Sequence, residues 1–141
     1  MSYQHIAVAT SLLDEERMLI DKGVSLATAL SAKLSLIYVD EHHSYYYSEL
    51  GRMVHNFSEQ KFEAALRQEM QPMISAATYP ISEIIIRRGE LAYELNLAAT
   101  EKDIDLFIFG HHHDIWSNLF SAARNAINVL NIDVLVIPLQ E

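Results

Sequence analysis

The chain has 141 residues and a formal net charge of −9, with 19 acidic and 10 basic side chains and no cysteine. This acidic balance argues against nucleic acids and anionic membrane surfaces as partners, because both attract a basic protein surface. Without cysteine, disulfides, thiolate zinc sites and cysteine nucleophiles are excluded. Half of the residues are hydrophobic, so we expect a single packed domain over residues 1–141.

Five short apolar runs alternate along the chain with stretches of helical periodicity. The isoleucine triplet at 84–86 predicts a strand buried on both faces, Gly110 stops the fourth run and Pro138 ends the fifth. Strands joined by helical crossovers predict a Rossmann-like, doubly wound α/β fold, a five-stranded parallel sheet with helices on both faces. The predicted strands are residues 6–10, 34–39, 81–86, 106–109 and 134–137.

Four helices are predicted between these strands. Asp14 is a suitable N-cap for the first helix, and Gly23 beside its apolar stripe favours a close approach to the sheet. Pro72 predicts a bend or break near residues 70–72 of the second helix, because an interior proline lacks the N–H and clashes with the preceding turn. Apolar spacing places the helices at about residues 14–30, 62–77, 89–98 and 119–130.

The connection from Asp40 to Phe57 is long for a compact domain, and it contains Tyr45, Tyr46 and Tyr47. Structureless connections longer than about 12–15 residues are usually lids, binding loops or mobile segments. Tyrosine combines apolar area with a polar tip, so we interpret the run as a partly buried loop anchor, with a partner surface as the alternative.

A ligand of an open α/β sheet binds beyond the carboxyl ends of the strands, where the strand order reverses. A phosphate there needs backbone N–H groups that it can approach, usually supplied by glycines. Gly89 and Gly110 are the glycines at predicted strand ends, and neither Gly-x-Gly-x-x-Gly nor a Walker lysine occurs. Weak anion binding near Arg87, Arg88 and Arg124 is one alternative. The simpler interpretation is that Arg87 and Arg88 alternate outward at the end of a strand.

Three consecutive histidines follow Gly110. Imidazole ligates zinc, copper and nickel, but neighbouring residues of an extended loop point in different directions. His111 and His113 are therefore the pair that can share an ion, with Asp114, Asp40 or a histidine at 42–43 as a third ligand. We favour the simpler interpretation, in which one imidazole packs under the loop and the others face solvent, and we expect no metal site.

No catalytic residue is predicted. The serines lack a Gly-x-Ser-x-Gly elbow, so nucleophilic catalysis has no support. Phosphoryl transfer to an aspartate, as in receiver domains, needs that aspartate at the end of the third strand, where Arg87 and Arg88 stand. We therefore expect a protein that is not an enzyme.

The whole chain resembles the universal stress protein family, in the subgroup close to universal stress protein A. Gly110-His111-His112, followed by Trp116-Ser117, is specific to that subgroup. The segments that carry the resemblance are Tyr3 to Ile6, Ala32 to Asp40, Tyr79 to Glu83, Asp103 to Ser117 and Asp133 to Leu139.

The resemblance implies a sheet of order 3-2-1-4-5, a cytoplasmic homodimer and a role in surviving stress. ATP-binding members of the family carry a pattern similar to Gly-x2-Gly-x9-Gly-Ser/Thr across the fourth strand and helix. They also carry an aspartate after the first strand. That pattern falls here on Gly110, His113, Ala123 and Arg124, and the aspartate position falls on Ser11.

Only the first glycine of this pattern is present, so the resemblance implies no bound nucleotide and no cofactor. The alternative function is a nucleotide-dependent switch or slow ATPase with an atypical loop. Its residual nucleotide positions would be Ser11, Val39, Gly89, Gly110, His113 and Arg124.

The fifth strand would lie at a sheet edge, yet it is apolar and nearly uncharged. Such edges are usually covered or paired, and two copies about a two-fold axis close the edge symmetrically. The alternative is a monomer whose C-terminal tail shields the fifth strand, but only residues 139–141 are left to form such a tail. The same edge would allow hetero-dimers with related stress proteins. The predicted interface is Val134, Leu135, Val136, Ile137 and Pro138.

Overall fold

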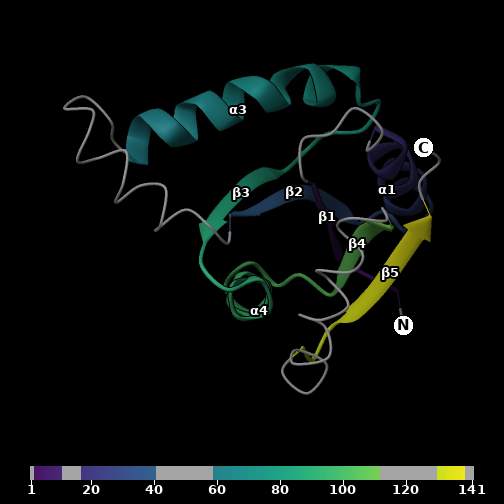
Figure 1. Ribbon diagram of the computed structural model, residues 1–141. Coiled ribbons are helices and arrows are strands. Elements are labelled where there is room, and N and C mark those ends of the chain that lie inside the picture. Colours follow the sequence, from purple (N-terminus) through teal and green to yellow (C-terminus); the bar gives the residue numbers. More distant parts are fainter. Residues whose placement is uncertain (1, 11–16, 41–58, 112–129, 139–141) are drawn as a thin grey trace.

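The structure, a computed structural model, describes residues 2–10, 17–40, 59–111 and 130–138. Five parallel strands form one sheet of order β3-β2-β1-β4-β5, which confirms the predicted fold class and strand order (Figure 1). The strands are β1 (His5–Ala9), β2 (Lys33–Asp40), β3 (Glu83–Arg88), β4 (Leu106–His111) and β5 (Asp133–Pro138). The described helices are α1 (Arg17–Leu30), α3 (Glu59–Ala76) and α4 (Leu91–Lys102).

Three predicted features fall outside the described residues. They are the N-cap at Asp14, nearly all of the long connection after Asp40, and the fourth helix up to residue 129.

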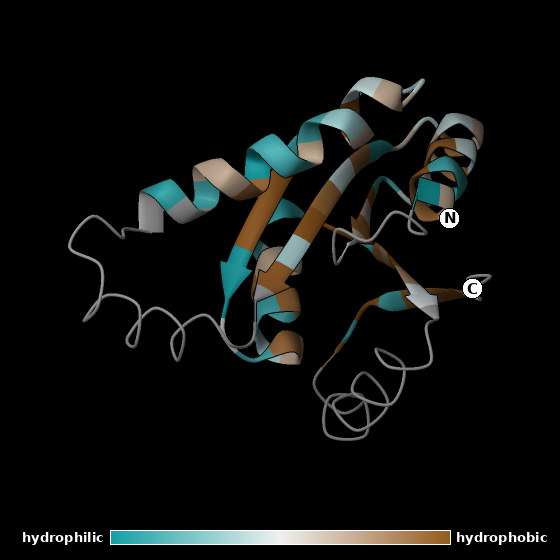
Figure 2. Cartoon of the chain, turned by 45° about the horizontal axis from the view of Figure 1, so that its top comes forward, coloured by the Kyte–Doolittle hydropathy of each residue, from teal (hydrophilic) through white to brown (hydrophobic). Residues whose placement is uncertain are grey.

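The sheet buries apolar side chains on both faces, as parallel strands with helical crossovers require. One core layer lies between the sheet and α1, and Met73 of α3 joins it. On the other face, Phe107 packs with Leu95 and Ala98 of α4. Figure 1 shows α3 and α4 on opposite sides of the sheet, and Figure 2 shows the hydrophobic colour concentrated along the strands.

Gly23 is a point of close contact between α1 and the sheet. A Cβ atom added there would lie 2.8 Å from Cγ2 of Val8 and 3.1 Å from Cδ1 of Leu34. Real Cβ contacts are not this short, so the predicted close approach is confirmed.

Hydrogen bonds tie the amino ends of the strands together. The Asp105 carboxylate accepts the backbone N–H groups of Gln4 and His5 at 2.8 and 3.0 Å, which anchors β1 beside β4. The Tyr3 hydroxyl donates to the Asp133 carboxylate at 2.6 Å, which links the start of the chain to β5. This hydrogen bond, followed by desolvation and by the negative charges of Asp133 and Asp105, raises the pKa of Tyr3.

The break expected at Pro72 does not occur, because α3 continues through it to Ala76. Pro72 and Gln68 are both exposed, so water can bond the Gln68 carbonyl that the proline leaves without its helical donor. Burial of Met70 and Met73, on either side of the proline, favours the continuous helix.

Several strand ends differ from the prediction. β3 is shifted by two residues from 81–86, and β4 begins at Leu106 as predicted but continues through Gly110 to His111. The ends of β1, β2 and β5 each differ by a single residue. Gly110 and His111 pair with β5, and the last two residues of β3 pair with the end of β2. Backbone pairing with a neighbouring strand therefore extends these strands past their apolar runs.

The isoleucine triplet is less buried than predicted. Ile85 is buried, whereas Ile84 and Ile86 are only half-buried. The reason is the position of β3 at the edge of the sheet, where one side of the strand has no neighbouring strand in the described sheet.

Candidate functional site

The strand order reverses between β1 and β4, so the carboxyl ends of these strands mark the ligand-binding position of an open α/β sheet. Gly110 lies there in β4 and is buried, paired with Ile137 of β5. Val39, near the end of β2, is half-buried. Ser11, His113, Ala123 and Arg124 lie outside the described residues.

Gly89 stands apart from this position. It follows β3, which β2 and β1 separate from β4, so three strand spacings of roughly 4.8 Å each lie between the two strands. Gly89 has a φ of +140°, and an added Cβ would lie 3.1 Å from a carboxylate oxygen of Glu94. Glu94, in the first turn of α4, already places a negative charge at the helix end that would attract an anion.

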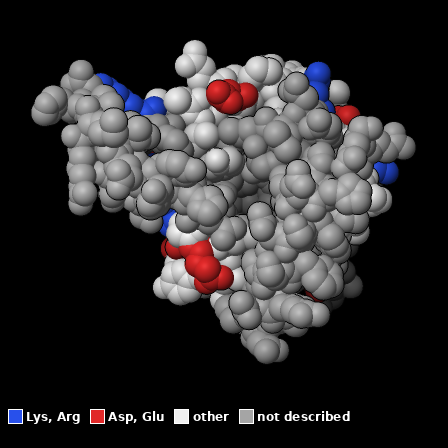
Figure 3. Space-filling view, in the orientation of Figure 1, with Lys and Arg blue, Asp and Glu red and all other residues white. Residues whose placement is uncertain are grey.

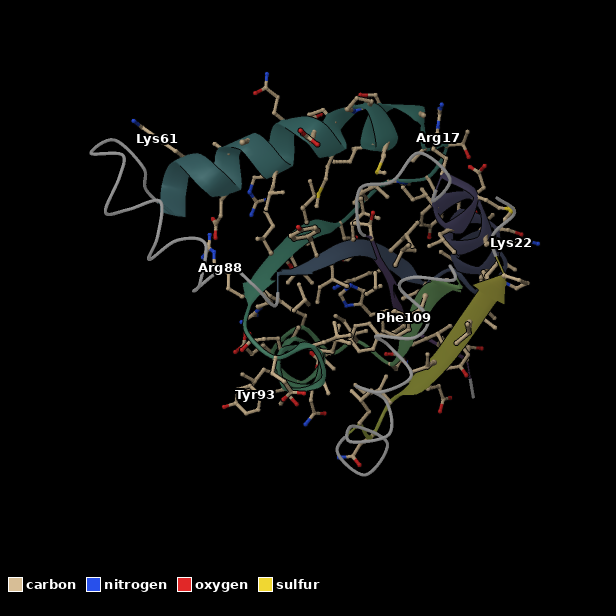
Figure 4. The ribbon with its side chains drawn as sticks, viewed as in Figure 1. Arg17, Lys22, Lys61, Arg88, Tyr93 and Phe109 are labelled. Carbon is tan, nitrogen blue, oxygen red and sulfur yellow. The ribbon has the colours of Figure 1, made fainter. Side chains whose placement is uncertain are left out.

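The two neighbouring arginines point to opposite faces of the sheet and are engaged there. The Arg87 guanidinium pairs with Glu101 of α4. The Arg88 guanidinium pairs with Glu63 of α3 at 3.0 Å and lies near the end of β3 (Figure 4). The structure therefore agrees with alternation at a strand end, and it gives both guanidinium groups a carboxylate partner within the chain.

The histidine run gives no described metal site. In the part of the chain that the structure describes, no group of three His, Asp or Glu side chains is placed to hold an ion. His112 and His113 lie outside this part, and of His111 only the backbone is described.

His5, at the start of β1, is buried in the described part of the chain. Its Nδ1 lies 2.8 Å from the Lys102 carbonyl oxygen, which can only accept, so Nδ1 carries the proton. Its Nε2 lies 2.7 Å from the Ser35 hydroxyl, and both side chains are buried. Sequence reasoning did not single out His5, whose one signal is a polar residue at the start of an apolar strand.

The outer edge of the sheet carries exposed apolar side chains. Val134, Leu135 and Val136 of β5 are 41%, 41% and 39% exposed, whereas Ile137 is buried. Pro138 is exposed. β5 pairs with β4 on one side, and nothing in the described sheet pairs with its other side.

The described surface fits an acidic protein. Figure 3 shows acidic side chains in separate groups on one face, with lysine and arginine side chains toward its margins. Among the described helices, none is long and apolar enough to cross a membrane.

The strand order, the reversal between β1 and β4 and the sequence around Gly110 define one class of protein. Residues 2–138 match the model of the universal stress protein family, and the chain belongs to this family. It is 38% identical to universal stress protein A of Salmonella typhimurium strain LT2, and the alignment covers 100% of the chain and 98% of that relative.

Solved structures of the same fold include nucleotide complexes. A universal stress protein in complex with cAMP is 22% identical, with a TM-score of 0.63 and 98% of each chain covered. The universal stress protein of Archaeoglobus fulgidus in complex with dAMP is 16% identical, with a TM-score of 0.60, covering 99% of this chain and 100% of that one. At these identities the likeness establishes the fold.

Proposed function

We propose that this universal stress protein contributes to stress resistance as a cytoplasmic homodimer that binds no nucleotide and catalyses no reaction. The observation that carries the proposal is the residue set at the family's nucleotide pattern, in which only Gly110 is present. His113 and Ala123 add side chains where phosphate oxygens would approach the backbone, and Arg124 replaces the expected serine or threonine.

The described surroundings support this proposal. Arg87 and Arg88 are engaged by Glu101 and Glu63, so a phosphate would have to compete with two carboxylates for them. Glu94 adds a negative charge beside Gly89. Because the Arg87 and Arg88 guanidinium groups already have carboxylate partners, they do not compensate for the glycines that the nucleotide pattern lacks.

The alternative is a nucleotide-dependent switch or slow ATPase. It is favoured by two family members of the same fold whose structures hold cAMP and dAMP. It would use Gly110 and the residual positions Ser11, Val39, Gly89, His113 and Arg124.

Calorimetric titration with ATP and Mg²⁺ separates the two functions. We expect no measurable heat with the natural chain, and micromolar affinity would overturn the proposal. A matched variant restores the pattern with His113→Gly, Ala123→Gly and Arg124→Ser, and we expect it to bind ATP more tightly than the natural chain. If the restored variant also fails to bind, the missing glycines and serine are not the reason for the lack of binding.

The homodimer is proposed through β5. Its support is an apolar, uncharged and exposed stretch from Val134 to Val136 at the sheet edge, which pairing would cover. Ile137 and Pro138 complete the proposed interface, and related stress proteins with a similar edge strand would form hetero-dimers through it. The net charge of −9 supports a protein that binds neither nucleic acid nor membranes.

A further inference from the structure

We propose that Met73 is an oxidant-sensitive site, at which hydrogen peroxide converts the thioether to a sulfoxide and thereby loosens the end of α3 from α1. This inference goes beyond the proposed function and depends neither on the homodimer nor on the nucleotide pattern. The chain has five methionines and no cysteine, so reversible oxidation of a side-chain sulfur must take place at methionine. The methionines in the described part of the chain are Met18, Met70 and Met73.

A small open pocket lies between the start of α1 and the end of α3, and Met73 forms part of its wall. Its volume is about 120 Å³, whereas a water molecule occupies roughly 30 Å³ in the liquid, so a molecule the size of hydrogen peroxide fits. Arg17 and Asp21 are exposed and make its rim polar, and Figure 4 shows Arg17 beside the end of α3. The other lining residues are Ile20, Met73, Ala76 and Ala77.

Exposure separates Met73 from the other methionine of the same helix. Met73 is 9% exposed at the pocket, while Met70, in the preceding turn, is 0% exposed. Oxidation of a sulfur requires access of the oxidant to it. Peroxide therefore reaches the Met73 side chain from the pocket, but it reaches Met70 only when α3 opens locally.

The proposed reaction is the transfer of one oxygen atom. A lone pair of the Met73 sulfur attacks one oxygen of hydrogen peroxide, so that an S–O bond forms and the O–O bond breaks. The second peroxide oxygen takes up the proton of the transferred oxygen and leaves as water. The sulfur is oxidised and the peroxide is reduced, each by two electrons, and the product is methionine sulfoxide.

A sulfoxide does not suit the position of Met73. The side chain belongs to the core layer between α1 and the sheet, in which Ile20 is also buried. A buried sulfoxide oxygen needs a hydrogen-bond donor, and Ile20, Ala76 and Ala77 have no side-chain donor to offer. Among the described lining residues, Arg17 is the one with such a donor, and it lies exposed at the rim with the water. The oxidised side chain must therefore turn out of the core.

The last turn of α3 depends on this packing. Pro72 leaves the Gln68 carbonyl without its helical donor, which weakens the backbone of the helix near its end. After the proline, the residues around the helix end that pack against the core are Met73, Ile74 and Ala77. Loss of the Met73 contact therefore loosens this turn from α1. Methionine sulfoxide is reduced enzymatically, so the change is reversible and can act as a switch.

Peptide mass spectrometry after brief treatment of the natural chain with hydrogen peroxide measures the access of the oxidant to each methionine. We expect the initial rate of oxidation of Met73 to be at least about fivefold higher than that of Met70, because only Met70 requires α3 to open. An equal or lower rate at Met73 would show that the pocket gives no selective access, and the inference would be wrong.

Urea denaturation of the treated protein measures the consequence of the oxidation. We expect the oxidised natural chain to unfold at a lower urea concentration than the untreated chain. Met73→Leu, which nearly conserves the side-chain volume, should keep its midpoint after the same treatment. Met18→Leu is the matched control, because Met18 is half-buried on α1, and we expect it to lose as much stability as the natural chain.

Two results would contradict the proposed consequence. If Met73→Leu loses as much stability on treatment as the natural chain, oxidation at another residue is responsible. If Met73 of the natural chain is fully oxidised by mass and the urea midpoint does not fall, the sulfoxide does not loosen α3.

Discussion

Gly23 determines how closely α1 lies against the sheet. On helix propensity alone, Gly23→Ala would stabilise the helix by about 1 kcal/mol. The new methyl group would however lie 2.8 Å from Cγ2 of Val8, a buried β-branched residue on a central strand. Overpacking of this kind costs about 1–3 kcal/mol, so after the gain in helix propensity we expect a net loss in the free energy of unfolding of up to about 2 kcal/mol by urea denaturation.

Ser25→Ala is the matched control for this change, because Ser25 is exposed on the same helix. We expect it to be as stable as the natural chain or slightly more so. If Gly23→Ala is equally stable, the close approach of α1 does not require glycine.

His5 illustrates a residue whose role depends on partners far along the chain. Its ring bonds to Lys102, which lies 97 residues away, and to Ser35, which lies 30 residues away. Removing one partner from such a buried group typically costs about 1–3 kcal/mol. The histidine run after Gly110 attracts attention in the sequence, yet the histidine with described buried contacts is the isolated one.

At the scale of the elements, a hydrogen bond between Tyr3 and Asp133 connects the start of the chain with β5. The Tyr3 hydroxyl donates to the Asp133 carboxylate, and this bond is the chief cause that raises the pKa of Tyr3 above its ordinary value of 10.0. The folded state thus holds the phenol proton more tightly than the unfolded state does. The resulting stabilisation is fully present below about pH 10 and is lost as the pH rises through the folded pKa.

We therefore expect the stability difference between the natural chain and Tyr3→Phe to be constant below about pH 10 and to shrink above it. Urea denaturation of both proteins between pH 7 and pH 11 measures this difference. An Asp133→Asn background is the control, because it removes the carboxylate and should weaken the pH dependence. A difference that does not change with pH would argue against a hydrogen bond in solution.

Pro72 shows how an element depends on its surroundings. Local chemistry predicts a bend or break at this residue, and the break does not occur, because α3 is one helix from Glu59 to Ala76. Met70 and Met73 are buried on one side of the helix, and Pro72 is exposed. The packing of the apolar face therefore outweighs the one backbone hydrogen bond that the proline removes.

For the whole molecule, the proposed homodimer predicts that a charge at the centre of the β5 edge prevents pairing. We expect Val136→Asp to give a monomeric mass by light scattering, because a buried carboxylate without a partner is strongly unfavourable. Val136 is 39% exposed in the single chain, so the fold should tolerate the change. An unchanged dimeric mass would count against β5 as the interface.

Two controls accompany Val136→Asp. Far-UV circular dichroism must match that of the natural chain, since an unfolded protein would also lose its dimeric mass. Tyr93→Asp places the same charge on α4, where the side chain is 56% exposed, and we expect it to remain dimeric.

The sequence by itself determined the class of the fold and the strand order, the latter through the family resemblance. It also identified the close approach at Gly23, the position of Gly110 at a strand end and the apolar character of β5. Each of these features depends on a short stretch of residues, through its periodicity, its glycines or its match to a family pattern. They can therefore be predicted without knowing which residues pack against that stretch.

Only the tertiary structure decided the features that need a distant partner. It extended β4 to His111 through pairing with β5, kept α3 continuous through Pro72, and gave Arg87 and Arg88 their carboxylates on opposite faces of the sheet. A hydrogen bond or ion pair is short-ranged in space but carries no signature along the chain. The sequence therefore indicates which groups need partners, and the fold decides which partners they find.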